Sequence, residues 1–428
     1  MYKIIRLATT KLLPNHSHPV KSPIIRTFLS NAYYCEDVWN QRLKSPVLQK
    51  VNLEELYYEI EQSFNKNRQL NALDIDIFAN ALQDESLYNE LLDVVHKLRL
   101  TADTNNTLDS TSHAVVRALL QFGKIDDLLN ALDDRLNYGL FLDYYTANIL
   151  MDCFWKSKSY ASGARVASQL MLQEEFEHPL SCNFSLLHCY NYLLNPVGWP
   201  EYVPPPEPEE EIKIRVKYIR NPYDDEHFDL RDAQKIVGKT LSMFSKNKSD
   251  PLHQSFRILG LVLFGKDEQA QKVITACNNP LYSEILKLVP KESSVHENLT
   301  NIKTVSDNVQ EILIENVKKS VENTSEKDIS LQCEIFEKWC NDRSSRMEQQ
   351  KERLRTAKRL QTVDDLQKIL KDKEEKLWFF ENEEQIDLEI DSRTKFYPKR
   401  WFGNKRPPKQ VDAGYVPPEV QKKIENIT

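Results

Sequence analysis

Glycine is scarce in this chain of 428 residues. Nine glycines are present, about 2% of the residues where ~7% is usual. They are scattered, and nowhere do they form the GxGxxG or GxxxxGK[ST] spacing whose backbone N–H groups surround the phosphates of dinucleotides or nucleoside triphosphates. The sequence therefore gives no basis for such a nucleotide site, and no cofactor is predicted.

Other missing features narrow the class of protein further. No apolar run approaches eighteen residues, so no membrane span is predicted. The seven cysteines are too few and too scattered for a disulfide framework, and they fit buried thiols in a reducing compartment. The nine histidines show neither HExxH nor zinc-ligand spacing, and no GxSxG occurs. We therefore predict no metal site, no catalytic residue and no small-molecule substrate.

Acidic residues are absent from the first 35 positions, which carry five basic residues; the first carboxylate is Glu36. Leucines and isoleucines are interspersed there with Ser and Thr, without a continuous apolar run. This pattern is typical of a mitochondrial presequence rather than a secretory signal, although an ordinary basic arm would share it. We expect residues 1–35 to be a presequence and N-terminal arm, and the protein to reside in the mitochondrial matrix.

The most informative feature that is present is a repeat with a period of 35 residues. Thr111, Thr146 and Ser181 are spaced 35 apart, and each opens an apolar run. Sliding residues 111–145 onto 146–180 pairs apolar with apolar residues at thirteen positions, where chance would give roughly six. A period in the mid-thirties indicates stacked helical pairs, and weaker copies extend upstream to about residue 74. We therefore predict an all-α solenoid.

Each copy is expected to hold two helices. Thr146 or Asn148 is predicted to cap the first helix of the second copy, and a break at 157–159 precedes its second helix. The apolar stripes that these helices should bury are Leu150, Met151 and Phe154 on the one, and Leu128, Leu132 and Leu136 on the second helix of the preceding copy. Gly163 interrupts the second helix, at an expected cost of roughly 1 kcal/mol relative to alanine.

The residues of the repeat carry a family resemblance. The pattern D-x-x-T-x-N-x-L-M-x-x-F-x-K, from Asp143 to Lys156, resembles the opening of a pentatricopeptide repeat, a family with the same period. The strings YGLFLDYYTANILMDCFWKSKSY and LMLQEEFEHPLSCNFSLLHC, with the later GLVLFGK, resemble the pentatricopeptide-repeat proteins of the mitochondrial small ribosomal subunit. The resemblance implies a non-catalytic component that contacts small-subunit mitochondrial ribosomal RNA and other mitochondrial ribosomal proteins.

In RNA-reading members of the wider family, the fifth and the last residue of a repeat contact a base. The residues that match these positions are His113, Asp143, Asn148, His178 and Asn183. Residues 111–194 hold six basic and nine acidic side chains, however, a balance that attracts RNA phosphates poorly. Asn148 and Asn183 as helix caps is the structural alternative to base reading.

The tail offers a second set of RNA-binding candidates. Residues 393–409 contain seven basic and no acidic side chains, interleaved with four aromatic ones. Basic groups neutralise phosphates and aromatic rings stack on bases, so this segment suits RNA, although a disordered solubility tail would also fit. The candidates here are Lys395, Lys399, Arg400, Trp401, Lys405 and Arg406.

Composition divides the chain into segments. After the N-terminal arm we expect the repeat array at 36–194, a Pro/Glu-rich linker at 195–222, a second helical segment at 223–290 and a low-order linker at 291–328. A long helix with a thin coiled-coil-like seam is predicted at 329–385, and an extended basic aromatic tail at 386–428. The seam fits either a pairing partner or a solvated helix with a narrow packing stripe.

Three functions remain open from sequence. The preferred one is a structural component of the mitochondrial small ribosomal subunit. The alternatives are a free RNA-binding factor that processes mitochondrial transcripts or acts in their translation, and a helical adaptor that contacts only proteins.

Overall fold

The computed structural model describes residues 28–201, 230–277, 279–290, 293, 295 and 303–393. It divides into two units, residues 1–350 and 351–428, which are described separately. Helices make up nearly all of the regular structure in the described residues, so the predicted all-α fold is confirmed. A two-residue parallel pairing of β1 (Leu281–Tyr282) with β2 (Thr304–Val305) was not expected.

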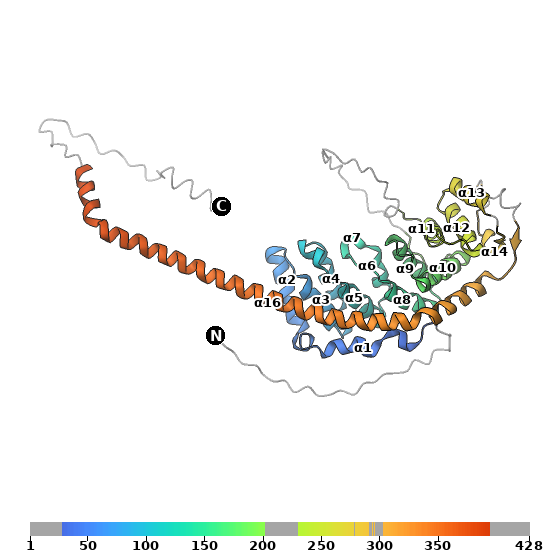
Figure 1. Ribbon diagram of the computed structural model, residues 1–428, viewed down its shortest axis with the longest axis horizontal. Coiled ribbons are helices and arrows are strands. Elements are labelled where there is room, and N and C mark those ends of the chain that lie inside the picture. The colour runs from blue at the N-terminus through green and yellow to red at the C-terminus, as the bar shows by residue number, and fades with distance from the viewer. Residues whose placement is uncertain are drawn as a thin grey trace. The chain divides into compact units, whose positions relative to one another are not determined.

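The first unit begins with short helical turns and then continues as helical pairs (Figure 1). The opening elements are η1 (Asn31–Tyr34), α1 (Glu36–Gln41), η2 (Arg42–Lys44), η3 (Leu48–Lys50) and α2 (Leu53–Asn67). The array follows as α3 (Ala72–Ala81), η4 (Glu85–Leu87), α4 (Tyr88–Arg99), η5 (Ala102–Asn106), α5 (Asp109–Gln121), α6 (Ile125–Asp133), α7 (Arg135–Tyr138), α8 (Tyr144–Lys156), α9 (Tyr160–Leu172) and α10 (Pro179–Leu194). After the undescribed residues come α11 (Ala233–Phe244), α12 (Pro251–Leu263), α13 (Asp267–Ala276), α14 (Ser283–Leu286) and α16 (Val309–Arg393).

The 35-residue period reappears in the structure. Helices α3, α5, α8 and α10 form one row, which we call the inner row. They carry Asp76, Thr111, Thr146 and Ser181 at successive intervals of 35, all buried. The predicted break at 157–159 separates α8 from α9. Leu150, Met151 and Phe154 are buried in one continuous apolar core that extends from Leu29 to Phe336.

Two local expectations are wrong. Asp143, not Thr146 or Asn148, caps α8: its carboxylate accepts a hydrogen bond from the Thr146 backbone N–H at 3.0 Å. An aspartate is as good a cap as threonine, and it stands one residue before the helix. Leu136 does not extend the stripe of Leu128 and Leu132, because α6 ends at Asp133 and Leu136 lies in the separate turn α7 with 79% of its surface exposed.

Gly163 has a packing role that outweighs its low helix propensity. A Cβ atom at this position would overlap with Nδ1 of the His188 ring on α10. The His188 ring is fully buried, and its Nε2 is 2.9 Å from the Met151 carbonyl oxygen, to which it donates. The glycine therefore allows α9 and α10 to approach around a histidine.

Helix α16 begins at Val309, about twenty residues before the predicted start of the long helix. Its N-terminal part, in the first unit, has one buried face made of residues one or two helical turns apart: Val309, Leu313, Val317, Ser320, Asp328, Gln332, Phe336 and Arg343. Four of these residues are polar or charged. Apolar periodicity therefore does not reveal this stripe, and the low-order linker predicted at 291–328 overlaps its first half.

The second unit contains the rest of α16. From residue 351 to 380 every side chain is exposed, including Leu354, Leu366 and Leu377 of the predicted seam. Residues 351–360 carry five basic side chains and one acidic one, whereas 361–393 are dominated by acids. No helix in the described part of the chain is long and apolar enough to cross a membrane.

Candidate nucleic-acid interface

The five repeat positions predicted to read RNA lie along the inner row. His113, Asn148 and Asn183 occupy matching places on α5, α8 and α10, whereas Asp143 and His178 are the N-caps of α8 and α10. In Figure 1, the orange ribbon of α16 crosses this row. It meets the repeats in reverse order, from Asn183 through His178 and His113 to Asp76. The structure therefore gathers the predicted residues on one face and covers that face.

His113 is enclosed by aromatic rings. Its ring centroid lies 4.9 Å from that of Trp39, 5.2 Å from that of Phe336 and 5.1 Å from that of Trp339. The residue is 3% exposed, and neither ring nitrogen has a hydrogen-bond partner; Nδ1 is 3.8 Å from Oδ2 of Asp143. Burial lowers the pKa of His113, so the ring is neutral at physiological pH.

Asn148 belongs to a closed ring of five hydrogen-bonded side chains, which we call the polar ring. Its amide donates to the Tyr33 hydroxyl at 3.1 Å, and that hydroxyl donates to Asp328 at 3.0 Å. His178 Nε2 is 3.2 Å from the other Asp328 oxygen, and His178 Nδ1 is 3.1 Å from the Ser181 hydroxyl, which donates to Asn148 at 2.9 Å. Both predicted base-reading groups in this ring are thus used internally.

Asn183 also contacts α16. Its amide nitrogen donates to the Ser320 hydroxyl at 2.6 Å. It also donates a longer hydrogen bond, at 3.4 Å, to the Asn316 carbonyl oxygen. Neither Asn148 nor Asn183 is a helix cap, because both lie inside their helices. The Asn183 amide therefore binds the chain's own α16, and the Asn148 amide binds Tyr33 and Ser181, so both amides are used within the chain.

The N-terminal segment, residues 28–41, also packs against this face and contacts α16 there through Tyr33 and Trp39. The Asp152 carboxylate, fully buried on α8, accepts hydrogen bonds from the backbone N–H of Phe28 and the hydroxyl of Tyr34, both at 3.0 Å. Lys156 pairs with Asp152 at 2.9 Å. Leu29 and Tyr33 are fully buried, so part of the segment predicted as a presequence and arm is a structural element of the fold.

A buried ion pair attaches α16 to the first helix of the inner row, α3. Arg343 Nε donates to Asp76 Oδ2 at 2.7 Å, and both side chains are at most 2% exposed. Asp76 also accepts hydrogen bonds from the hydroxyls of Ser110 and Thr111 on the next repeat. The pair links α16 to the first helix of the row through a charge-assisted contact.

Sequence reasoning missed Tyr33, Asp76, Asp328 and Arg343. Only Asp76 gave a usable signal, as an acidic residue at the 35-residue register of Thr111 within an otherwise apolar helix. The tail candidates Lys395, Lys399, Arg400, Trp401, Lys405 and Arg406 lie outside the described residues and stay predictions.

The fold and this face define an all-α helical-repeat protein whose inner row is covered by its own termini. The sequence model of the family described as mitochondrial 28S ribosomal protein S27 matches residues 4–291 and 268–369. The chain belongs to this family. It is therefore a component of the mitochondrial small ribosomal subunit, located in the mitochondrial matrix, and the family implies a structural role in association with the RNA and proteins of that subunit.

Proposed function

We propose that this protein is a non-catalytic, pentatricopeptide-like scaffold of the small subunit that contacts ribosomal RNA from outside its inner row. The polar ring carries this proposal. Single-strand reading by Asn148 or His178 requires their hydrogen-bonding groups to be free, and in the closed structure they are satisfied by Tyr33, Asp328 and Ser181. The array then serves to hold a shape rather than to read a sequence.

Opening the inner row would be costly. Displacing α16 would separate Arg343 from Asp76 and would expose the aromatic cluster around His113. Uncovering a single buried aromatic side chain already costs about 1.5–3 kcal/mol. RNA bases would have to supply at least this much binding free energy before any net affinity appeared. An acidic array offers little phosphate attraction toward that cost.

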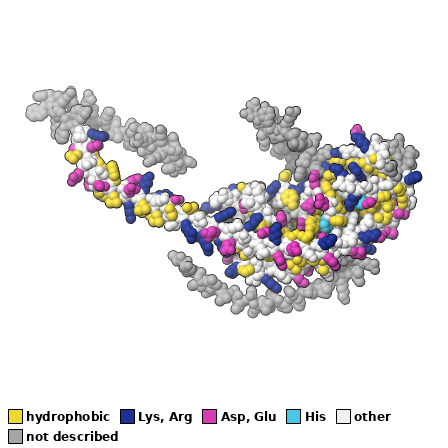
Figure 2. Space-filling model, in the orientation of Figure 1, with side chains coloured by type: hydrophobic (Ala, Val, Ile, Leu, Met, Phe, Trp, Pro, Cys, Tyr) yellow, Lys and Arg dark blue, Asp and Glu magenta, His cyan; other side chains and the backbone are white. Residues whose placement is uncertain are grey.

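The exposed basic turns at the start of the second unit are better placed to bind RNA. Lys351, Arg355, Lys358 and Arg359 share one helix face by their spacing, and all four are exposed. On the face shown in Figure 2, by contrast, basic and acidic side chains alternate over the first unit. We therefore propose that this basic face, together with the basic aromatic tail, supplies the phosphate contacts.

The test maps RNA crosslinks in purified small subunits that carry variants of this helix. Replacing Lys351, Arg355, Lys358 and Arg359 with glutamine should weaken crosslinks to ribosomal RNA. Replacing Lys368, Lys371, Lys373 and Lys376, which are interspersed with acids on the same helix, serves as the matched control and should change little. Equal effects of both sets, or none, would refute the proposed basic contact.

The same subunits separate the scaffold from a free RNA-binding factor. On a sucrose gradient of mitochondrial lysate, a scaffold sediments with small-subunit ribosomal RNA, whereas a free factor stays near the top. Asn148→Ala and Asn183→Ala should leave RNA crosslinks of the assembled protein unchanged. Loss of crosslinks in these variants, with the fold intact, would instead support base reading by the repeats. Crosslinking that recovers no RNA at all would indicate a protein-only adaptor.

A further inference from the structure

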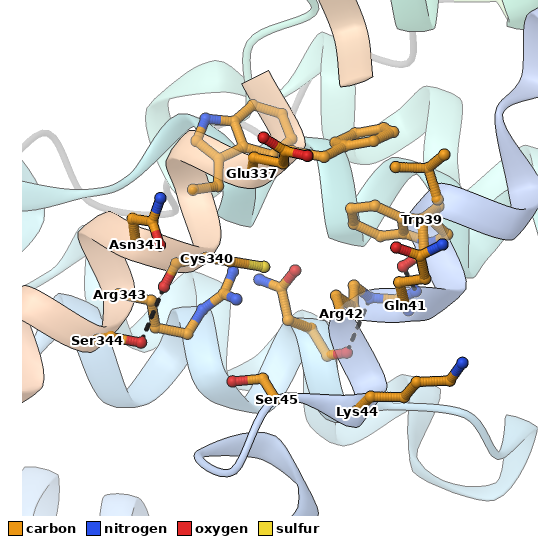
Figure 3. Close-up of a pocket in the computed structure, with 14 residues that line it drawn as sticks. Trp39, Gln41, Arg42, Lys44, Ser45, Glu337, Cys340, Asn341, Arg343 and Ser344 are labelled. Carbon is orange, nitrogen blue, oxygen red and sulfur yellow. Dashed lines mark hydrogen bonds between the residues drawn. The ribbon is translucent and has the colours of Figure 1, made fainter. Parts of the chain in front are cut away.

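A pocket of about 530 Å³ lies in the first unit where the N-terminal segment, α3 and α16 meet. Its volume falls within the roughly 300–1,000 Å³ of small-ligand sites. Figure 3 shows Trp39 and Arg42 on one side, and Cys340, Arg343 and Ser344 from α16 on the other. The pocket is separate from the polar ring, and the proposed function does not use it.

Positive charge collects around this pocket with little to neutralise it. Arg42, Lys44 and Arg343 line it, against one lining acid, the exposed Glu337. Asp76 compensates only Arg343, through Nε, and the buried Nη1 of that arginine has no hydrogen-bond partner. An unpaired charged donor in a nearly fully buried side chain is costly unless something binds it.

Arg42 is held in place by fixed contacts that leave its charge unpaired. Its Nε donates to the Asn80 carbonyl oxygen at 3.1 Å and its Nη1 to the Trp39 carbonyl oxygen at 2.9 Å, while the guanidinium lies 3.8 Å from the Trp39 ring centroid. None of these partners is an anion. Burial, and then the positive charges of Arg117 and Arg343, lower the pKa of Arg42 to about 9. An anion between these arginines would relieve that repulsion.

We propose that this pocket binds a phosphate group. Guanidinium groups match phosphate oxygens in charge and in hydrogen-bond geometry, and here they approach from two elements that are fixed by packing. Ser45 lines the pocket and adds a hydroxyl donor. The phosphate can come from a ribonucleotide free in solution or from the backbone of ribosomal RNA, and the two sources are distinguished by the experiment below.

The experiment measures the thermal midpoint of the full chain as inorganic phosphate replaces chloride at constant ionic strength. A specific site raises the midpoint with a saturable dependence on phosphate concentration. Arg42→Gln should raise the apparent dissociation constant for phosphate about tenfold, the size expected for losing one charge-assisted contact. Lys44→Gln, at the exposed rim, should raise this dissociation constant by a smaller factor. Lys50→Gln removes the same charge on the neighbouring turn η3 outside the pocket and should match the wild type.

The variants separate site binding from the general stabilising effect of phosphate. A rise in midpoint that persists unchanged in both Arg42→Gln and Lys44→Gln, or no saturable rise in the wild type, overturns the proposal. If Arg42→Gln fails to fold, the comparison of Lys44→Gln with Lys50→Gln still decides. With binding established, a crosslink from residues 39–45 to ribosomal RNA in the assembled subunit identifies RNA as the source. Phosphate binding without that crosslink identifies a free phosphate compound.

Discussion

At the scale of single residues, the first unit depends on buried polar groups that pair across long sequence distances. Asp76, Asp152 and Asp328 are all at most 6% exposed, and each binds a segment that lies far from it in the chain. Such pairs add little when intact, because desolvation offsets their attraction, but breaking one is costly. They therefore specify how the termini dock more than they raise stability.

The Arg343 and Asp76 pair allows a direct test of this view. Arg343→Met should destabilise the protein by about 3–5 kcal/mol, because it leaves the Asp76 carboxylate buried without its cation. Urea unfolding followed by circular dichroism measures the change. Arg346→Met, three residues further along the same helix at an exposed site, is the control and should cost under about 1 kcal/mol. Equal costs for the two variants would contradict the role assigned to the buried pair.

His188 should make stability fall in acid. Burial lowers its pKa to about 4, whereas an unfolded histidine titrates near 6.5. Between these values the unfolded chain binds a proton that the folded chain does not, so stability decreases as pH falls below about 6.5. From pH 7 to pH 5 this histidine alone should cost roughly 2 kcal/mol. Unfolding at both pH values should show a smaller decrease for His188→Gln than for the wild type, and an identical decrease would exclude His188 as the cause.

Gly163 and His188 should also be coupled. Gly163→Ala improves helix propensity, yet its methyl group would collide with the His188 ring, and such overpacking costs about 1–3 kcal/mol. In the His188→Ala background the same change should be nearly neutral. A double-mutant cycle measures this difference. An additive cycle would mean that the ring moves aside without cost.

At the scale of elements, the N-terminal segment is part of the folded core. Residues 28–41 contribute Leu29, Tyr33 and Trp39 to the core, so a presequence that included them would leave the imported protein incomplete. We therefore expect the mature N-terminus at or before Phe28, and mass spectrometry of the mitochondrial protein measures it directly.

Recombinant truncations test the same point. A chain that starts at residue 28 should unfold like the full chain, whereas one that starts at residue 36 should lose several kcal/mol, because burying a leucine or an aromatic side chain contributes about 1.5–3 kcal/mol each. A mature protein that begins after Leu29, or equal stability of both truncations, would show that this segment is dispensable.

At the scale of the molecule, stability is expected to reside in the first unit. Every side chain from 351 to 380 is exposed, so ending the chain at residue 350 should shift the thermal midpoint by only about 2 °C. Ending it at residue 308 removes α16 entirely and uncovers the aromatic rings around His113. That variant should unfold at a clearly lower temperature and bind hydrophobic dyes. A large loss on removing only residues 351–428 would contradict the assignment.

The sequence predicts the array better than its cover, for a physical reason. Helices α8 and α9 bury apolar stripes, and the 35-residue period of these stripes is visible in the sequence. The docked face of α16 mixes Leu313 and Phe336 with Asp328 and Arg343, because the surface it meets carries matching polar groups. A docked face that mixes polar and apolar residues leaves no apolar periodicity in α16. Tyr33 likewise gave no indication of its partners 115 and 295 residues away.

The docked part of α16 also connects repeats that are not neighbours in the solenoid. Stacked repeats ordinarily contact only their neighbours, so a solenoid can bend along its length and can unfold one repeat at a time. Here a single helix, α16, is attached at Ser320 to the fourth inner helix and at Arg343 to the first, and at about 1.5 Å per residue that interval is roughly 35 Å. Because the two attachments are separated by a fixed length of helix, we expect the array to keep one curvature.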